Sequence, residues 1–228
     1  MVRVAINGFG RIGRTFLRSA VGHDDFTVVA VNDLGDLDTL AYLLEYDSVY
    51  GRSPFSVEIK DGALVVDGNK IEFLQERDPA KLPWEAHEID VVVESTGFFT
   101  TYAGAKKHLT AGAKRVVISA PAKDDPAETD VPAGTVLMGV NEDALKEYHI
   151  TSNGSCTTNA TSPLIAILKE SIGIEQALLN TVHAYTSTQS LVDGPAKKDV
   201  RKGRAAALNI IPTTTGAAIA TTKVHTEL

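Results

Sequence analysis

A single cysteine is the most reactive side chain in this sequence. Cys156 is the only cysteine among 228 residues, and it lies in the run Ser152-Asn153-Gly154-Ser155-Cys156-Thr157-Thr158-Asn159. A lone cysteine in an intracellular protein is often a small buried hydrophobic residue. The hydroxyl and amide neighbours argue against that interpretation, because each would need a hydrogen-bond partner in a core. They suit a thiolate and an anionic substrate, so Cys156 is a candidate nucleophile.

A histidine that could activate this thiol follows in a strand-like segment. Residues 174–185 predict a strand on which His183 shares a face with Thr181 and Tyr185. A histidine on a strand is often structural. With Cys156 as its partner, His183 would instead act as a general base and acid.

The start of the chain has the pattern of a nucleotide-binding unit. A β-rich run, Val2 to Asn7, leads into Gly8-Phe9-Gly10-Arg11-Ile12-Gly13, and residues 11–21 predict a helix. A second strand, residues 26–32, ends at Asp33, which is 20 residues after Gly13. Strand, glycine turn, helix, strand and acid in this order indicate a dinucleotide site. Gly8 and Gly10 could otherwise form an ordinary tight turn, and Asp33 could cap a strand end.

Asp33 also indicates whether the site would bind NAD or NADP. Its carboxylate can accept hydrogen bonds from ribose hydroxyls and would repel a 2′-phosphate. The next residues are Leu34, Gly35 and Asp36, with no arginine beside them to hold such a phosphate. The sequence therefore predicts NAD rather than NADP.

The remaining pattern predicts an α/β protein. We expect helices over 36–46, 101–109 and 142–148, the last capped by Asn141, and strands over 55–60, 64–73, 89–94, 115–119 and 135–140. Asp61-Gly62 would form a turn between the segments 55–60 and 64–73, and Asp67-Gly68 a turn within the second, so these strands are expected to be antiparallel. Trp84 is interpreted as a packing residue. Alternating strands and helices indicate a Rossmann-type doubly wound parallel sheet over residues 1–150. A domain boundary is expected near Ile150, with residues 151–228 in a second domain.

The helix near the cysteine has two possible starts. Ser162 could cap it, with Pro163 at its first position. Alternatively, the helix begins at Cys156 and contains Pro163. Only the second option places the thiol at a helix N-terminus, where its pKa would be lowered.

Two polar segments complete the candidate site. Residues 186–204 form a long loop that contains Asp193-Gly194-Pro195 and Lys197-Lys198, and loops of this length are usually functional or interfacial. Its lysines could equally be a solvated charged face. Residues 213–216, Thr-Thr-Thr-Gly, could donate hydrogen bonds to a phosphate, or could be a hydroxyl-rich turn or cap.

Composition excludes several classes of function. The net charge of −7 and pI of about 5.4 argue against a nucleic-acid partner, with a local exception near residues 197–204. No apolar run is long enough for a signal peptide or a membrane span. A single cysteine excludes a disulfide framework and suits the cytoplasm. No metal site is expected.

Five stretches together resemble the phosphorylating glyceraldehyde-3-phosphate dehydrogenase family. They are Asn7 to Gly13, Ser155-Cys156-Thr157-Thr158-Asn159, Thr181-Val182-His183-Ala184-Tyr185-Thr186, Asp193-Gly194-Pro195 and Thr215-Gly216-Ala217-Ala218. They cover essentially the whole chain in the family's order. The resemblance implies NAD, a phosphorylated aldehyde and inorganic phosphate as ligands, and a homotetramer for the full-length family.

The resemblance also implies residue roles. Cys156 would be the nucleophile and His183 its base and acid. The segment 186–204 would pack at a tetramer interface. The expected cofactor-binding residues are Asn7, Gly8, Gly10, Arg11, Ile12, Gly13, Asp33, Arg77, Thr96 and Ser119, and the expected substrate- and phosphate-binding residues are Ser155, Thr157, Thr186, Thr215 and Gly216.

Several positions depart from the family pattern. Gly154 replaces a more usual alanine, Ala160 a second cysteine, and Ile219 a common lysine, and the family continues beyond Leu228. The last of these departures implies that residues 151–228 are part of an α+β catalytic domain truncated on its C-terminal side. Half a sheet would leave an exposed edge, which predicts poor solubility and weak or absent activity. A relative acting on erythrose 4-phosphate, and a non-catalytic remnant that binds NAD or a full-length homologue, are alternative interpretations.

Overall fold

The computed structural model describes residues 1–196 and 199–225. The chain divides into two compact units, Met1–Cys156 and Thr157–Leu228. Lys197 and Lys198 of the predicted loop, and the last three positions of the predicted second domain, lie outside the described residues.

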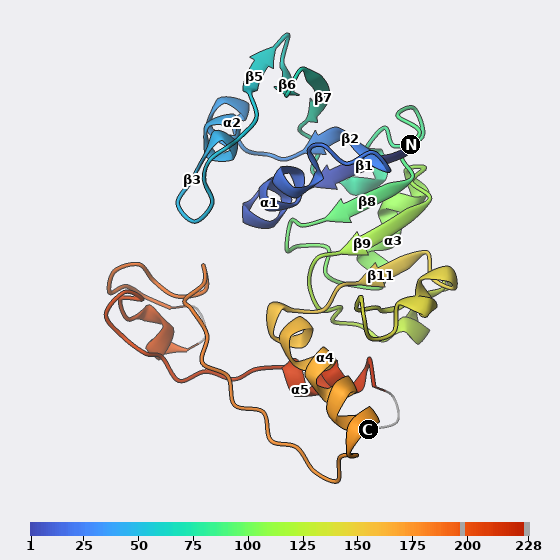
Figure 1. Ribbon diagram of the computed structural model, residues 1–228. Coiled ribbons are helices and arrows are strands. Elements are labelled where there is room, and N and C mark those ends of the chain that lie inside the picture. The colour runs from blue at the N-terminus through green and yellow to red at the C-terminus, as the bar shows by residue number, and fades with distance from the viewer. Residues whose placement is uncertain (197–198, 226–228) are drawn as a thin grey trace. The chain divides into compact units, whose positions relative to one another are not determined.

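The first unit is built on one large sheet (Figure 1). In the described residues its strand order is β10-β11-β9-β8-β1-β2-β7-β6-β5. From β10 to β7 all neighbours are parallel, and the β5-β6-β7 meander adds antiparallel strands at one edge. The bounds are β1 (Val2–Asn7), β2 (Phe26–Asn32), β5 (Val57–Lys60), β6 (Ala63–Val66), β7 (Asn69–Leu74), β8 (Val91–Glu94), β9 (Arg115–Ile118), β10 (Ala133–Thr135) and β11 (Ile150–Ser152).

Helices cover both faces of this sheet because its central strands carry apolar residues on both sides. Alternate residues of β1 enter different cores: Val4 and Ile6 pack with residues of α1 (Arg11–Ala20) and α2 (Leu37–Glu45), whereas Ala5 packs with residues of α3 (Tyr102–Thr110). Trp84 is fully buried in the second core, which confirms its predicted packing role. The predicted α/β class with a Rossmann-type doubly wound parallel sheet is confirmed.

The predicted turn chemistry is also confirmed. Asp61, Gly62, Asp67 and Gly68 all have positive φ values, between 49° and 79°. Two consecutive residues of this kind form the tight connections that match the twist of antiparallel strands. Shorter elements of the first unit are β3 (Tyr46–Asp47), β4 (Gly51–Arg52), η1 (Pro79–Lys81), η2 (Pro126–Glu128) and η3 (Glu142–Lys146).

Three local predictions near the end of the first unit are wrong. The strand expected over 135–140 is Ala133–Thr135, and β11 (Ile150–Ser152) was not predicted because it is only a three-residue run. The helix expected over 142–148 is the 3₁₀ segment η3. Asn141 does not cap it, because its side chain accepts from Leu137 N at 2.8 Å and donates to Thr135 O at 3.0 Å.

The described residues of the second unit form helices and irregular segments. Helix α4 (Cys156–Ser171) begins at the cysteine and contains Pro163, which decides between the two starts considered above. It is followed by η4 (Val200–Gly203) and α5 (Ala217–Thr222).

The strand predicted over residues 174–185 is not formed. The side chains of Leu178 and Val182 are each 94% exposed, and no segment of the described chain forms a ladder with these residues. A strand needs a neighbour for its backbone N–H and C=O groups, and the alternating pattern alone cannot supply one.

Candidate functional site

The carboxyl ends of β1, β2 and β8 meet at the centre of the sheet, where the strand order reverses. Beside β1 the chain turns through Gly8, whose φ is 93°. A Cβ at Gly8 would lie 2.5 Å from Thr96 N and 2.7 Å from Ser95 C, so the turns after β1 and β8 touch backbone to backbone. Open α/β sheets bind ligands at this kind of switch point.

The other two glycines of the turn have different surroundings. A Cβ at Gly13 would lie 2.2 Å from Gly8 O, so Gly13 allows α1 to pack closely on the turn. Gly10 is exposed, has nothing within 4 Å of a built Cβ, and caps α1 without a side-chain hydrogen bond. The N-terminal amides of α1 therefore face an open position suited to an anion.

Asp33 follows β2 and braces the same turn. Its Oδ2 accepts from Phe9 N at 2.6 Å, and its Oδ1 accepts from Gly35 N at 2.7 Å. Its half-buried carboxylate is thus oriented by two backbone amides beside the glycine turn. This is the place where a ribose-binding acid is expected.

The other predicted cofactor residues surround this centre at loop positions. Arg11 is exposed at the start of α1, where it forms an ion pair with Asp47 and lies 5.5 Å from the centre of the Tyr50 ring. Hydrogen bonds from Tyr50 N, the Arg11 side chain and Val49 N hold the pKa of Asp47 at about 2. Ile12 and Arg77 are exposed, whereas Ser119, directly after β9, donates its N–H to Glu94 O at 3.0 Å.

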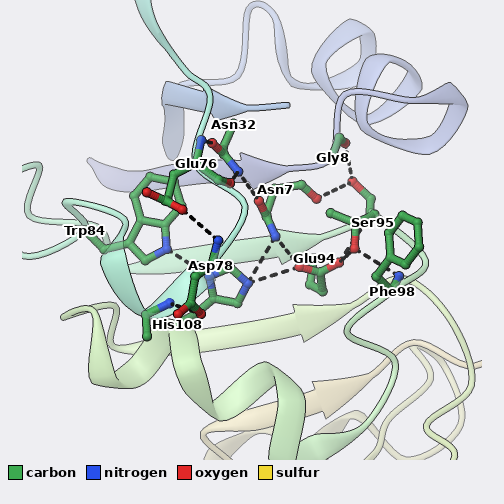
Figure 2. Close-up of polar contacts among 12 residues, drawn as sticks. Asn7, Gly8, Asn32, Glu76, Asp78, Trp84, Glu94, Ser95, Phe98 and His108 are labelled. Atoms are coloured by element: carbon green, nitrogen blue, oxygen red, sulfur yellow. Dashed lines mark hydrogen bonds and ion pairs between the residues drawn. The ribbon is translucent and has the colours of Figure 1, made fainter. Parts of the chain in front are cut away.

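A buried polar network lies beneath the switch point and was not predicted (Figure 2). Glu94, the last residue of β8, is 1% exposed and accepts from Asn7 Nδ2 at 2.5 Å. His108 Nε2 lies 3.0 Å from the same carboxylate, and Trp84 Nε1 donates to His108 Nδ1 at 2.9 Å. A glutamate that ends an otherwise apolar strand was the one signal in the sequence that could have indicated it.

Cys156 is placed as the nucleophile hypothesis requires. Its side chain is exposed and it is the first residue of α4, a 16-residue helix. Before it, Gly154 has a φ of 67° and donates its N–H to Ser152 Oγ at 3.2 Å. Ser155 and Thr157 on either side are half-buried. The thiol therefore lies next to helix N-terminal amides, which favour a thiolate.

The other predicted site residues belong to the second unit. His183 is exposed, and its Nδ1 lies 2.6 Å from Ala184 O. A carbonyl only accepts, so Nδ1 carries the proton and Nε2 is the basic nitrogen of the neutral ring. The Thr186 and Thr188 hydroxyls are 3.0 Å apart, and Thr215 Oγ1 accepts from Ala217 N at 3.1 Å. Gly216 immediately precedes α5.

The described part of the chain contains neither a metal-binding cluster nor a helix able to span a membrane. Among residues 1–196 and 199–225, no group of three or more His, Cys, Asp or Glu side chains could hold a metal ion. In the same residues, no helix combines the length and apolar character needed to cross a membrane.

Comparison with known proteins identifies the family of both halves. Residues 2–102 match the family model described as the NAD binding domain of glyceraldehyde 3-phosphate dehydrogenase, and residues 155–228 match the model of its C-terminal domain. The glyceraldehyde-3-phosphate dehydrogenase of Klebsiella pneumoniae is 51% identical over 223 residues, which are 98% of this chain and 71% of that protein. This chain belongs to the glyceraldehyde-3-phosphate dehydrogenase family.

Two further relatives have similar identities. The cytosolic glyceraldehyde-3-phosphate dehydrogenase of Trypanosoma brucei brucei is 52% identical over 223 residues, covering 98% of this chain and 65% of that protein. Glyceraldehyde-3-phosphate dehydrogenase A of Escherichia coli K12 is 49% identical over 227 residues, covering 100% of this chain and 66% of that protein. The chain thus spans about two thirds of the length of these relatives. NAD is the cofactor named for the domain that the first hundred residues match.

Proposed function

We propose that this protein oxidises glyceraldehyde 3-phosphate with NAD and inorganic phosphate through a thioester on Cys156. The observation that carries the proposal is the exposed thiol at the first residue of α4, in a chain that belongs to this family. The proposal assigns residues 1–150 to NAD binding and residues 151–228 to part of the catalytic domain. It also includes a cytoplasmic location, which the name of the trypanosome relative supports, and a homotetramer.

The NAD-binding part of the proposal follows from the switch point. The pyrophosphate would lie at the open N-terminus of α1, next to Gly10, and the adenosine ribose at Asp33. The remaining residues proposed for this site are Asn7, Gly8, Arg11, Ile12, Gly13, Arg77, Thr96 and Ser119. We assign Ser155, Thr157, Thr186, Thr215 and Gly216 to the phosphate groups of the substrate and of inorganic phosphate, because hydroxyls and backbone amides donate to such anions.

The chemistry assigns one task to each catalytic side chain. The Cys156 thiolate adds to the aldehyde carbon, which forms a C–S bond and leaves an alkoxide. His183 protonates and deprotonates this oxygen in turn, and its Nε2 is the nitrogen able to do so. Bound NAD would supply the hydride acceptor, and loss of hydride from that carbon would leave the acyl group on Cys156 as a thioester. Attack of phosphate on the thioester breaks the C–S bond, returns the thiolate and releases the acyl phosphate.

The single cysteine allows a direct test. The rate of alkylation by iodoacetamide is measured against pH, with and without NAD, for the wild type and for His183→Asn. We expect the wild type to react rapidly well below the ordinary thiol pKa of about 8.5, and His183→Asn to react more slowly there. Formation of NADH from aldehyde and phosphate, absent in Cys156→Ser, completes the test. A wild-type rate that simply follows an ordinary thiol, together with no NADH formation, would contradict the proposal.

A further inference from the structure

Glu94 is a buried carboxylate on which uncharged donors converge. Its Oε2 faces Asn7 Nδ2 at 2.5 Å and His108 Nε2 at 3.0 Å, and its Oε1 accepts from Thr96 N at 2.8 Å and from the Thr96 hydroxyl. The side chains of Glu94 and His108 are both 0% exposed. An ionised carboxylate has acceptor capacity for all of these donors, whereas an amide or a protonated acid does not.

The tautomer of His108 follows from its second partner. Trp84 Nε1 can only donate, and it lies 2.9 Å from His108 Nδ1. Nδ1 must therefore accept, so the proton of the ring is on Nε2 and is donated to Glu94. The two rings also stack at a centroid distance of 6.2 Å. Trp84 and His108 thus fix one side of the carboxylate.

On its other side Glu94 connects the loops of the proposed dinucleotide site. Asn7 uses both ends of its amide inside the network: Nδ2 donates to Glu94, and Oδ1 accepts from Asn32 Nδ2 at 2.7 Å. Asn32 in turn donates to Glu76 O and accepts from Glu76 N, each at 2.8 Å. The strand ends of β1, β2 and β8 and the loop that carries Arg77 are therefore joined by one chain of hydrogen bonds that ends on the Glu94 carboxylate (Figure 2).

Glu94 also shapes the turn that touches Gly8. The Thr96 hydroxyl, held by Glu94, accepts from Phe98 N at 3.0 Å. Ser95 Oγ donates to Gly8 O at 2.7 Å, which fastens the same turn to the glycine loop. A shift of the Glu94 carboxylate would move the backbone at Thr96, and with it the surface that faces a bound dinucleotide.

We propose that Glu94, supported by His108 and Trp84, is a positioning residue for the dinucleotide: it sets the Thr96 turn and the amides of Asn7 and Asn32 without itself contacting the cofactor. Both ends of the Asn7 amide are engaged in the protein, so Glu94 also fixes the orientation of this side chain of the proposed site. This inference rests on the proposed NAD site.

The first variant is Glu94→Gln, which keeps the shape of the side chain but offers one acceptor oxygen and one NH₂ group. That NH₂ group must face donors wherever it is placed, so either Thr96 or Asn7 has to move. We expect the Kd for NAD to rise about tenfold or more, because the loss of a charge-assisted hydrogen bond in a buried network has effects of this order. Isothermal titration of the full 228-residue chain with NAD measures this.

Asp90→Asn is the matched control. Asp90 immediately precedes β8, so the same carboxyl-to-amide change is made at the opposite end of the same strand. It accepts from Arg3 N at 2.8 Å and pairs with Lys114 at 2.7 Å, so the control loses an ion pair and weakens a part-buried hydrogen bond. We expect Asp90→Asn to lose stability in urea but to keep the wild-type Kd, which separates positioning from a general loss of stability.

His108 provides a second, independent pair of variants. His108→Leu removes the donor to Glu94 and the acceptor of Trp84, whereas His108→Gln can supply both through its amide. We expect His108→Leu to raise the Kd for NAD and His108→Gln to restore much of the affinity. Because Trp84 is the only tryptophan of the chain, its fluorescence reports directly whether the network is intact in each variant.

The outcomes are distinguishable. Wild-type affinity in folded Glu94→Gln, or equal affinity in the two His108 variants and the wild type, overturns the positioning role and leaves the proposed NAD site standing. An equal rise in the Kd for NAD in Asp90→Asn and Glu94→Gln also overturns the positioning role. A wild-type chain that binds no NAD overturns the proposed function, and this inference with it.

Discussion

At the scale of single residues, carboxylates held by neighbouring donors determine the shape of the loops in the first unit. Asp33 accepts two backbone amides beside the glycine turn, and Glu94 holds the turn at Thr96. Asp47 does the same after α2, where its Oδ1 accepts from Val49 N and Tyr50 N at 2.8 Å each. Such loops depend on the charge of one side chain.

The Asp47 contacts predict how stability depends on pH. The pKa of Asp47 is lowered to about 2, first by its hydrogen bond from Tyr50 N, then by the Arg11 side chain and Val49 N. Because the folded pKa lies below the unfolded value of about 3.9, its stabilising contribution is complete above about pH 4 and is lost as the pH falls towards 2. Asp47→Asn keeps an acceptor oxygen for both amides but loses the charge and the acceptor for the Arg11 side chain.

We therefore expect the urea midpoint of the wild type to exceed that of Asp47→Asn at pH 6, and the difference to shrink between about pH 4 and pH 2. Urea unfolding of both proteins across this range, followed by circular dichroism, measures the difference. Other carboxyl groups titrate alike in the two proteins and cancel. A gap of constant size down to pH 2 would show that the charge of Asp47 contributes nothing.

At the scale of elements, strand and turn signals predicted the first unit well because they depend on local chemistry. The glycine turn, Asp33 and the Asp-Gly connections each require particular residue types at particular backbone angles. Glu94 and His108 could not be paired from the sequence. The contact between Asn7 and Glu94 joins positions 87 apart, and no local pattern encodes that meeting.

Gly8 and Gly10 have different structural roles, which the G-x-G-x-x-G pattern does not distinguish. Gly8 allows a positive φ and close backbone contact, whereas Gly10 leaves open space before α1. Gly8→Ala forces a side chain into positive φ and against Thr96 N, so we expect a loss of about 1–3 kcal/mol in the free energy of unfolding. Gly10→Ala meets only open space and should cost about 1 kcal/mol or less.

Gly10→Ala should nevertheless weaken NAD binding, because its methyl group occupies the open position before α1. Urea unfolding and NAD titration of the two variants give the comparison, with each variant the control for the other. Equal losses of stability would show that close contact with Thr96 is not what requires a glycine at position 8.

At the scale of the whole molecule, the two units illustrate where sequence patterns fail. The parallel sheet was predictable because each strand is apolar on both faces and has neighbours within the same unit. Residues 174–185 have a strand-like alternating pattern, yet they are not a strand in the described chain. The pattern encodes a preference for extended backbone, whereas a strand also requires a partner. The candidate nucleophile could be proposed from the sequence because it depends on a residue type and on its immediate neighbours in the chain.

This difference predicts how backbone amides exchange with solvent. Amides of β1, β2, β8 and β9 lie in ladders at the centre of the sheet, so they should exchange only through large openings of the first unit. Residues 174–185 form no ladder with any described segment, and Leu178, Val182 and Tyr185 are exposed, so their amides should exchange within the shortest labelling time. Hydrogen–deuterium exchange followed by mass spectrometry measures both classes in one sample, and β5, an edge strand, is the internal control. Protection of 174–185 equal to that of β1 would show that this segment pairs as a strand in solution. A rise in that protection with protein concentration would then identify a second copy of the chain as its partner.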